Sequence, residues 1–272
     1  MYYGGPNRSR KGEANLFRRW KRLWAQCRPL ALGHLMLRAA VLCLGLWRLR
    51  QGRWDHAGLC LLTLGLCTIP ALSEWVLKLR VDSPLGFAAA AFAVCANVCG
   101  ETLGFYERIP WWDETLHVVW GFLAGLLGYA FLEILQKTKL RPGAAFLTAL
   151  SFSALTAVLW EFFEFAMDGI FPWDMQKDAW IQSVNSVLLN PEGLSDAVSV
   201  TADSVTVNGV SWPGLLDPGL RDTVSDLFLS FTGSLLAALA LLLSLRRGKL
   251  PKLLRGLMPA PFSETEVSDE KR

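Results

Sequence analysis

The sequence lacks the short motifs that mark several common enzyme mechanisms. It contains no H-E-x-x-H pair for a zinc protease, no G-x-S-x-G around a nucleophilic serine and no Walker loop for nucleoside triphosphates. No internal repeat is evident, although many secondary transporters are built from such repeats. Zincin, serine-hydrolase and P-loop mechanisms therefore have no support, and an inverted-repeat transporter is weakened as an explanation.

The cysteines and the N-terminus carry no sign of a secreted protein. All six cysteines lie in the first hundred residues, and none lies in the polar stretch 168–222, where a disulfide would be expected. Cys95 and Cys99 share a helix face, and apolar packing explains them best. No small-residue cleavage site follows the first apolar run, so we expect no cleaved signal peptide.

Charged residues are scarce, at 19% of the chain, whereas 52% of residues are hydrophobic and stand in long blocks. A helix needs about 20 predominantly apolar residues to cross a bilayer. The composition therefore predicts an all-α, polytopic membrane helical bundle of about six transmembrane helices. The six segments that qualify are Leu30–Trp47, Ala57–Leu77, Leu85–Leu103, Thr115–Leu135, Ala144–Met167 and Thr223–Leu245.

Lysine and arginine are distributed unevenly around these segments. Eight precede the first segment, and further groups follow the second, fourth and sixth. If six helices alternate, all four groups fall on one side, so the positive-inside rule predicts cytoplasmic N and C termini. Arg48, Arg50 and Arg53 are the exception. The basic N-terminus is explained by contact with anionic membrane lipids, and we expect no nucleic-acid partner.

Three regions are expected along the chain. Residues 1–29 form a basic amphipathic N-terminal segment, in which Phe17, Trp20, Leu23 and Trp24 recur at helical spacing. Residues 30–247 form the six-helix transmembrane domain, with an acidic outer loop at 168–222. Within that loop, Ala197–Trp212 predicts a β-hairpin around its Asn-Gly pair. Residues 248–272 form a polar cytoplasmic tail, which we expect to be disordered from Pro251 onward.

Acidic and histidine residues gather at one end of four apolar segments. Ionisable groups inside a membrane span cost several kcal/mol each unless they are paired or wetted, so they mark a functional site by default. Residues spaced by three, four or seven along a helix share a face. The groups are Glu101; Asp113 and His117; Glu161, Glu164 and Asp168; and Asp222 and Asp226.

Simpler roles explain some of these residues. Asp113 and Asp222 begin helices and could act as N-caps, worth about 1 kcal/mol each. Asp168 could end its helix in water. Capping does not explain the four groups that lie within helical turns, which are His117, Glu161, Glu164 and Asp226.

Several carboxylates at one membrane depth would repel one another. They must share protons, pair with a cation or bind a metal. Nearby basic side chains are few, with Arg108, Lys177 and Arg221 as the candidates. Oxygen ligands with one imidazole suit Mg²⁺, Mn²⁺, Ca²⁺ or Zn²⁺, so a divalent metal is the candidate cofactor. The predicted metal ligands are His117, Glu161, Glu164, Asp222 and Asp226; Glu101, Asp168 and Gln176 are further site candidates.

The motifs that carry these residues resemble one family. F-Y-E-R-I-P-W-W-D-E-T-L-H, ending at His117, L-W-E-F-F-E-F-A-M-D, ending at Asp168, and D-T-V-S-D-L, starting at Asp222, are similar to the YjdF-like family of uncharacterised bacterial inner-membrane proteins. The resemblance covers roughly residues 55–247 and implies a helical, multi-pass protein of the bacterial plasma membrane. More distantly, Asp-x-x-x-His with later acidic motifs looks like the VanZ-like proteins linked to glycopeptide tolerance. Neither resemblance implies an established reaction, so whether the protein is an enzyme stays open.

The favoured function is binding or catalysis on an envelope lipid or lipid-linked precursor, at an outward-facing carboxylate and histidine site. In this hypothesis His117 is a general base or metal ligand, Glu161 and Glu164 are metal ligands or acid–base groups, and Asp113 orients His117. One alternative is a small proton- or cation-coupled transporter, for which His34, Arg38 and Glu74 are the candidates for a continuing polar path. Another is a non-catalytic membrane partner whose cluster only stabilises the bundle.

Overall fold

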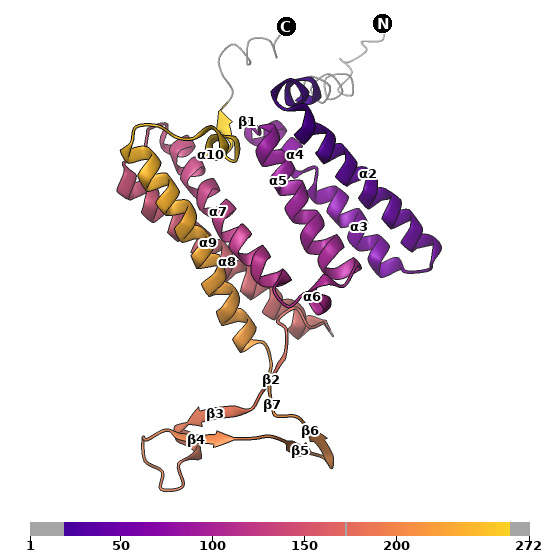
Figure 1. Cartoon of the computed structure of the whole chain (residues 1–272), viewed down its shortest axis with the longest axis vertical. Coiled ribbons are helices and arrows are strands. Elements are labelled where there is room, and N and C mark those ends of the chain that lie inside the picture. The colour runs from indigo at the N-terminus through magenta and orange to yellow at the C-terminus, as the bar shows by residue number, and fades with distance from the viewer. Residues whose placement is uncertain (1–18, 172, 262–272) are drawn as a thin grey trace, which may run out of the picture. The chain divides into compact units, whose positions relative to one another are not determined.

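Six apolar helical segments dominate the computed structural model (Figure 1), which describes residues 19–171 and 173–261. Each segment is long and apolar enough to cross a membrane, which confirms the predicted helical membrane bundle. They are α2 (Arg28–Arg50), α3 (Trp54–Leu66) with α4 (Ile69–Leu77), α5 (Ser83–Ala93) with η1 (Val94–Thr102), α7 (Trp112–Gln136), α8 (Pro142–Ile170) and α9 (Leu220–Arg246). A short helix, α6 (Phe105–Arg108), follows η1.

The chain divides into two compact units, which we describe separately. The first comprises Met1–Ser153 and Ser230–Arg272, and the second comprises Ala154–Leu229. In the first unit α2 packs against α3 and α5, and α3 packs against η1. The N-terminal segment is helical over residues 19–26; Phe17 and the rest of residues 1–18 lie outside the described residues.

The second apolar segment is broken into α3 and α4 near Pro70. Proline has no backbone N–H, and the amide of Ala71 donates to Thr68 at 2.9 Å instead of continuing the ladder to Cys67. The guanidinium of Arg38 on α2 donates to the carbonyl of Cys67. Broken helices are tolerated in membranes where side chains satisfy the freed backbone groups, and Arg38 has this role here.

The third segment departs from the regular helix expected over Leu85–Leu103. After α5 it widens into the π-helical turn η1, in which the amide of Leu103 donates to the carbonyl of Val98 at 2.9 Å. The indole of Trp112 on α7 donates to the carbonyl of Cys95 at 3.3 Å. A side chain of the next helix therefore bonds the backbone of the widened region.

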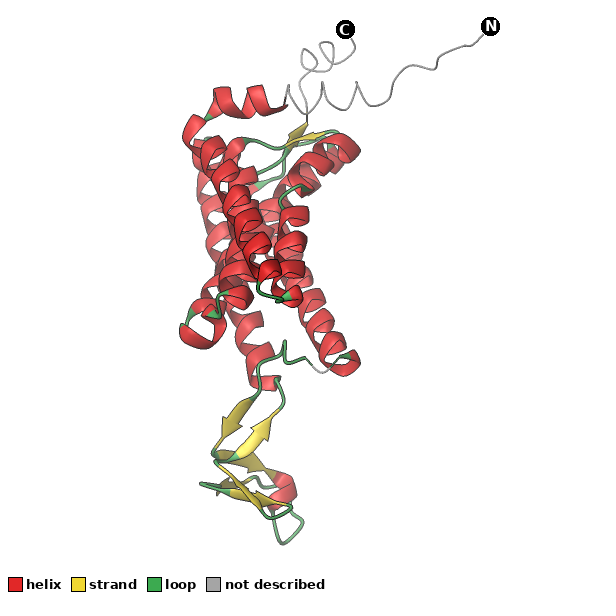
Figure 2. Ribbon diagram, turned by 90° about the vertical axis from the view of Figure 1, so that its right-hand side faces the viewer, coloured by secondary structure: helices red, strands yellow, loops and turns green. Residues whose placement is uncertain are grey.

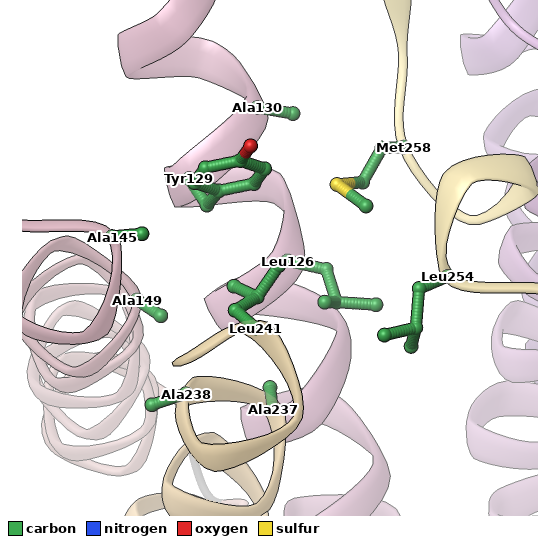
Figure 3. Close-up of a cluster of buried hydrophobic side chains, with 10 residues drawn as sticks. All are labelled: Leu126, Tyr129, Ala130, Ala145, Ala149, Ala237, Ala238, Leu241, Leu254 and Met258. Carbon is green, nitrogen blue, oxygen red and sulfur yellow. The ribbon is translucent and has the colours of Figure 1, made fainter. Parts of the chain in front are cut away.

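Small residues bring α7 and α9 into close contact. A Cβ at Gly121 would collide with the backbone carbonyl of Ser230, and a Cβ at Gly233 would collide with that of Val118. Small residues at helix interfaces let two backbones approach, which is a common packing mode in membranes. Figure 3 shows the adjoining apolar cluster, formed by Leu126, Tyr129, Ala130, Ala145, Ala149, Ala237, Ala238, Leu241, Leu254 and Met258.

The prediction of a disordered tail from Pro251 is wrong for the described residues of that tail. Lys252–Gly256 forms α10, and β8 (Ala260–Pro261) pairs antiparallel with β1 (Leu79–Arg80). Leu254 and Met258 are apolar side chains four residues apart, and both are buried in the cluster of Figure 3. Their burial supplies the hydrophobic contact that a solvated polar tail would lack. Residues 262–272 lie outside the described residues.

The loop of the second unit is built from short antiparallel strand pairs (Figure 2). The hairpin predicted over Ala197–Trp212 is confirmed for Val205–Trp212 only, since Val198–Thr201 pairs with Ser183–Ser186 instead; Asn208 and Gly209 at its turn have positive φ, at 52° and 80°, as a type I′ turn requires. It joins β5 (Val205–Val207) to β6 (Val210–Trp212). The other pairs are β2 (Ala179–Ile181) with β7 (Leu215–Asp217), and β3 (Ser183–Ser186) with β4 (Val198–Thr201); the 3₁₀ turn η2 (Val187–Leu189) follows β3.

Candidate functional site

Three of the predicted carboxylates come together within the second unit. Glu161 and Glu164 lie one turn apart on α8, and Asp226 lies in the second turn of α9. Their side chains offer carboxylate oxygens that lie within 4.8 Å of one another. The exposed fractions of the three residues are only 5%, 7% and 3%, respectively. We call Glu161, Glu164 and Asp226 the carboxylate cluster.

The carboxylate cluster has the chemistry of a cation site. Two unit charges about 4 Å apart repel by about 4 kcal/mol at an effective dielectric constant of 20, so three ionised carboxylates require compensation. Protons or a divalent cation would supply it, and hard cations such as Mg²⁺ and Ca²⁺ prefer oxygen ligands. The indole N–H of Trp160 donates to Oε1 of Glu164 at 2.9 Å, which holds this carboxylate in orientation. Trp160 was not among the predicted site residues.

Asp168 binds backbone rather than ending its helix in water. Its two carboxylate oxygens accept from the amides of Met175 and Gln176, at 2.7 and 2.8 Å. The side-chain amide of Gln176 donates to the hydroxyl of Thr223 on α9 at 2.6 Å. Asp168 and Gln176 therefore connect the start of the loop to the C-terminal end of α8 and the N-terminal end of α9.

Asp222 has a similar role. Its Oδ2 accepts from the backbone amide of Lys177 at 3.0 Å, across 45 residues of sequence. Asp222 lies in the first turn of α9, which begins at Leu220, so it is not the N-cap residue considered from the sequence. Among the described residues, the group that could hold a metal within this unit contains Asp226 and not Asp222.

Removing the Asp168 carboxylate should loosen the loop. Asp168→Ala leaves the amides of Met175 and Gln176 without this acceptor, at about 1–3 kcal/mol for each buried donor. Local opening of the loop should rise accordingly, and we expect trypsin to cleave after Lys177 about 30-fold faster than in the wild type, the ratio to which about 2 kcal/mol corresponds. Asp203→Ala removes an exposed acid from the same loop and serves as the control. Equal cleavage rates in the two variants would contradict the proposed role of Asp168 in holding the loop.

Slight desolvation and acidic neighbours raise the pKa of one exposed loop carboxyl outside the helices. The pKa of Asp178 is raised, first by desolvation and then by repulsion from Asp174, Asp168 and Asp217. Because a raised pKa disfavours the charged carboxylate, the folded loop loses stability as the pH rises through that pKa. Because Asp178 is exposed, solvent screens this repulsion, and its effect on the stability of the loop is small.

Asp113 and His117 form a second arrangement, within the first unit. Nε2 of His117 lies 3.7 Å from Oδ1 of Asp113 one turn earlier on α7, and the histidine is 9% exposed. Nδ1 of His117 lies 3.4 Å from the hydroxyl of Ser230 on α9. Asp113 thus contacts the ring it was predicted to orient. Its predicted alternative, an N-cap, is not seen, because Trp111 is the N-cap residue of α7.

Two residues stand apart from the expected pattern. Glu101 is exposed at the end of η1, where its charge acts on His56. Ser230 was not predicted, although its position is recognisable afterwards. It is a hydroxyl residue one turn after Asp226 on α9, and it is 1% exposed. A buried polar residue on the face that carries a predicted site residue is the signal that would have found it.

The six apolar helices with buried carboxylates define a multi-pass membrane protein. A family model described as "Predicted membrane protein (DUF2238)" matches residues 30–247. The chain therefore belongs to the DUF2238 family of predicted membrane proteins.

One further relative is similar over part of the chain. An uncharacterized protein of Thermotoga maritima is 41% identical over 81 residues, which cover 28% of this chain. The match spans 40% of that protein's own length. No solved structure matches the chain.

Proposed function

We propose that the carboxylate cluster binds a divalent cation and that the bound cation engages the phosphate of an envelope lipid or lipid-linked precursor. The single observation that carries this proposal is the convergence of Glu161, Glu164 and Asp226, all nearly buried, with oxygens within 4.8 Å of one another. An all-oxygen set of this kind suits Mg²⁺, Mn²⁺ or Ca²⁺.

The position of the cluster along its helices supports a lipid as the substrate. Glu161 lies nine residues before Ile170, the last residue of α8, which is about 13 Å at 1.5 Å per residue. Asp226 lies six residues after Leu220, the first residue of α9, which is about 9 Å. A cation held near the ends of membrane helices is within reach of lipid headgroups, whose phosphates are natural partners for hard cations.

The chain offers acid–base groups for such a role. Within the first unit, taken by itself, we propose that His117 acts as a general base and that Asp113, in contact with its Nε2, orients the ring. The YjdF-like and VanZ-like resemblances are compatible with an envelope role. The proposal covers both catalysis on a substrate and binding alone. His117→Ala distinguishes the two, since binding alone does not require a base.

No contact among the described residues specifically favours the transport alternative. It required a polar path through His34, Arg38 and Glu74. Glu74 forms ion pairs with Arg19 and Arg22, and Arg38 bonds the carbonyl of Cys67 at the helix break. These contacts give the two residues structural roles.

Metal analysis of the purified protein tests the proposal. We expect about one equivalent of a divalent metal in the wild type by inductively coupled plasma mass spectrometry after dialysis against Mg²⁺ or Mn²⁺. Glu161→Gln keeps the shape of the side chain but removes a charged ligand, and we expect it to lower metal affinity by at least the roughly 10- to 100-fold that loss of a group supporting a ligand typically costs. Glu114→Gln, at an exposed position in the first turn of α7, is the matched control and should retain the metal.

The experiment also separates the remaining hypotheses. Equal metal content in Glu161→Gln and the wild type would remove the cation proposal. If the wild type binds no metal and the variant is only less stable, the cluster belongs to a non-catalytic membrane partner.

A further inference from the structure

The first unit contains a cavity of about 400 Å³ that none of the preceding roles uses. It lies among the helical residues 19–26, α2 and α5. Its lining combines two guanidinium groups and an imidazole with apolar side chains; among the lining residues are Arg19, Trp20, His34, Leu35, Arg38 and Gly86. A cavity with a few converging polar groups in an apolar wall is the usual form of a small-molecule site.

Each of the two guanidinium groups that line the cavity has an N–H donor left unsatisfied by the described residues. Nη2 of Arg19 and Nε of Arg38 are buried and have no hydrogen-bond partner among the described residues. A buried donor without an acceptor costs about 1–3 kcal/mol, and more when it belongs to a charged group. Both donors belong to side chains that line one cavity, and an acceptor placed in the cavity could satisfy them after a rotation of each guanidinium group.

Among the described residues, the guanidinium groups that line the cavity bond one carboxylate and one backbone carbonyl. Glu74 accepts from Nε of Arg19 at 2.7 Å and also from Arg22, so one carboxylate serves two cations. Arg38 donates to a carbonyl, which carries no net charge. The pKa of Arg19 is lowered, mainly by burial and further by repulsion from Arg22 and Arg38, although Glu74 raises it. An anion in the cavity would relieve both the desolvation and the repulsion.

The apolar part of the lining indicates what kind of anion fits. Leu23 and Leu30 add to the wall formed by Trp20 and Leu35, and Leu35 is half exposed at its surface. Such a surface gains by burying a hydrocarbon chain, which a free inorganic ion lacks. Guanidinium groups bind phosphate oxygens with two parallel donors, so a phosphate joined to an acyl chain matches both parts of the lining.

We propose that this cavity binds the phosphate of an anionic phospholipid, with Arg19 and Arg38 donating to the phosphate oxygens and the acyl chain lying along Trp20, Leu30 and Leu35. The site is distinct in its residues from the carboxylate cluster, and it does not depend on the function proposed for that cluster. Its role is recognition of an anionic lipid next to the first membrane helix.

Binding of short-chain lipids to the full-length protein in a neutral detergent tests the proposal. Dihexanoyl phosphatidylglycerol should bind at least about tenfold more tightly than dihexanoyl phosphatidylcholine, measured by isothermal titration calorimetry. Arg19→Gln should weaken phosphatidylglycerol binding about tenfold or more, since a hydrogen bond to a charged group contributes about 1.5–3 kcal/mol. Arg28→Gln removes the same charge from an exposed position outside the cavity and should change affinity less than about twofold.

A second variant tests the cavity without changing charge. A Cβ at Gly86 meets no atom within 4 Å, so Gly86→Leu can fill the cavity without a backbone collision. We expect it to weaken phosphatidylglycerol binding as strongly as Arg19→Gln while leaving the thermal midpoint of the protein at or above that of the wild type.

The outcomes separate the two sources of a phosphate. If inorganic phosphate competes as well as phosphatidylglycerol, the site takes a free phosphate and the lipid part of the proposal is overturned. If the two lipids bind equally, or if Gly86→Leu and Arg28→Gln behave alike, the anion site itself is overturned. Preference for phosphatidylglycerol that is lost in both cavity variants and kept in Arg28→Gln supports the proposal.

Discussion

Gly233→Leu should prevent stable folding of the membrane bundle. A Cβ at this position would collide with the carbonyl of Val118 on α7; the backbone fixes the Cβ position, and the carbonyl is itself a backbone group that cannot rotate away. Gly121 meets the carbonyl of Ser230 in the same way, so α7 and α9 touch along two consecutive turns. Overpacking a tight contact costs about 1–3 kcal/mol even when side chains can adjust, and more where the helices must separate. We expect a loss above about 3 kcal/mol.

Thermal unfolding of the detergent-purified protein measures this loss. Separating α7 from α9 would also open the cluster in Figure 3, which includes Leu126 on α7 and Leu241 on α9. Gly65→Leu is the matched control, because it makes the same substitution in α3, where a Cβ meets nothing within 4 Å and the residue is exposed. A midpoint for Gly233→Leu equal to that of Gly65→Leu would contradict the close crossing.

The helices were predictable because hydropathy reports burial in a membrane directly. The expected Thr115–Leu135, for example, became α7 over Trp112–Gln136. Local irregularities within the helices were harder to predict from the sequence. Pro70 signalled the break between α3 and α4, but no residue of η1 signals its widening, and the bond from Trp112 to the carbonyl of Cys95 is a tertiary contact. The ordering of Leu254 and Met258 likewise required the apolar surface they cover.

In the candidate site, too, features of a single helix were predictable and tertiary contacts were not. Spacing along one helix predicted that Glu161 and Glu164 share a face, and the predicted ligand Asp226 lies beside them in the structure, whereas the predicted ligand Asp222 does not belong to that group. Contacts between distant segments could not be derived from spacing. Asp168 and Asp222 resembled helix-end residues, and only the fold of the loop shows that they accept from backbone amides of residues 175–177. Acidic residues at helix ends have the same sequence pattern whether they bind water, loop amides or metal.

Glu74→Gln should lower stability through charge rather than shape. The Glu74 side chain is 7% exposed and interacts with Arg19 and Arg22, whose side chains are 15% and 21% exposed. Its Oε1 also accepts from the amide of Val81 at 2.7 Å, and a glutamine oxygen can keep that bond. Breaking a buried ion pair costs about 3–5 kcal/mol, and we expect about 3 kcal/mol because the arginines retain some solvent contact.

Comparison with an exposed pair isolates the effect of burial. Asp55 pairs with Arg53 at 3.0 Å, and their side chains are 60% and 49% exposed. Exposed pairs of this kind contribute little, so Asp55→Asn should leave the thermal midpoint unchanged. The double variant Arg19→Gln/Glu74→Gln should be less destabilised than the sum of the single variants, because residues in one ion pair are coupled. Additive losses would show that Glu74 acts through some other contact.

The loss in Glu74→Gln also bears on what occupies the neighbouring cavity. Without the carboxylate, the positive charge of Arg19 is less compensated, and a bound anion gains a stronger electrostatic partner. A ligand that binds the folded state stabilises it in proportion to the logarithm of its concentration over its dissociation constant. Phosphatidylglycerol should therefore raise the thermal midpoint of Glu74→Gln more than that of the wild type. A smaller rise in the variant would mean that Glu74 positions Arg19 for binding rather than competing for it.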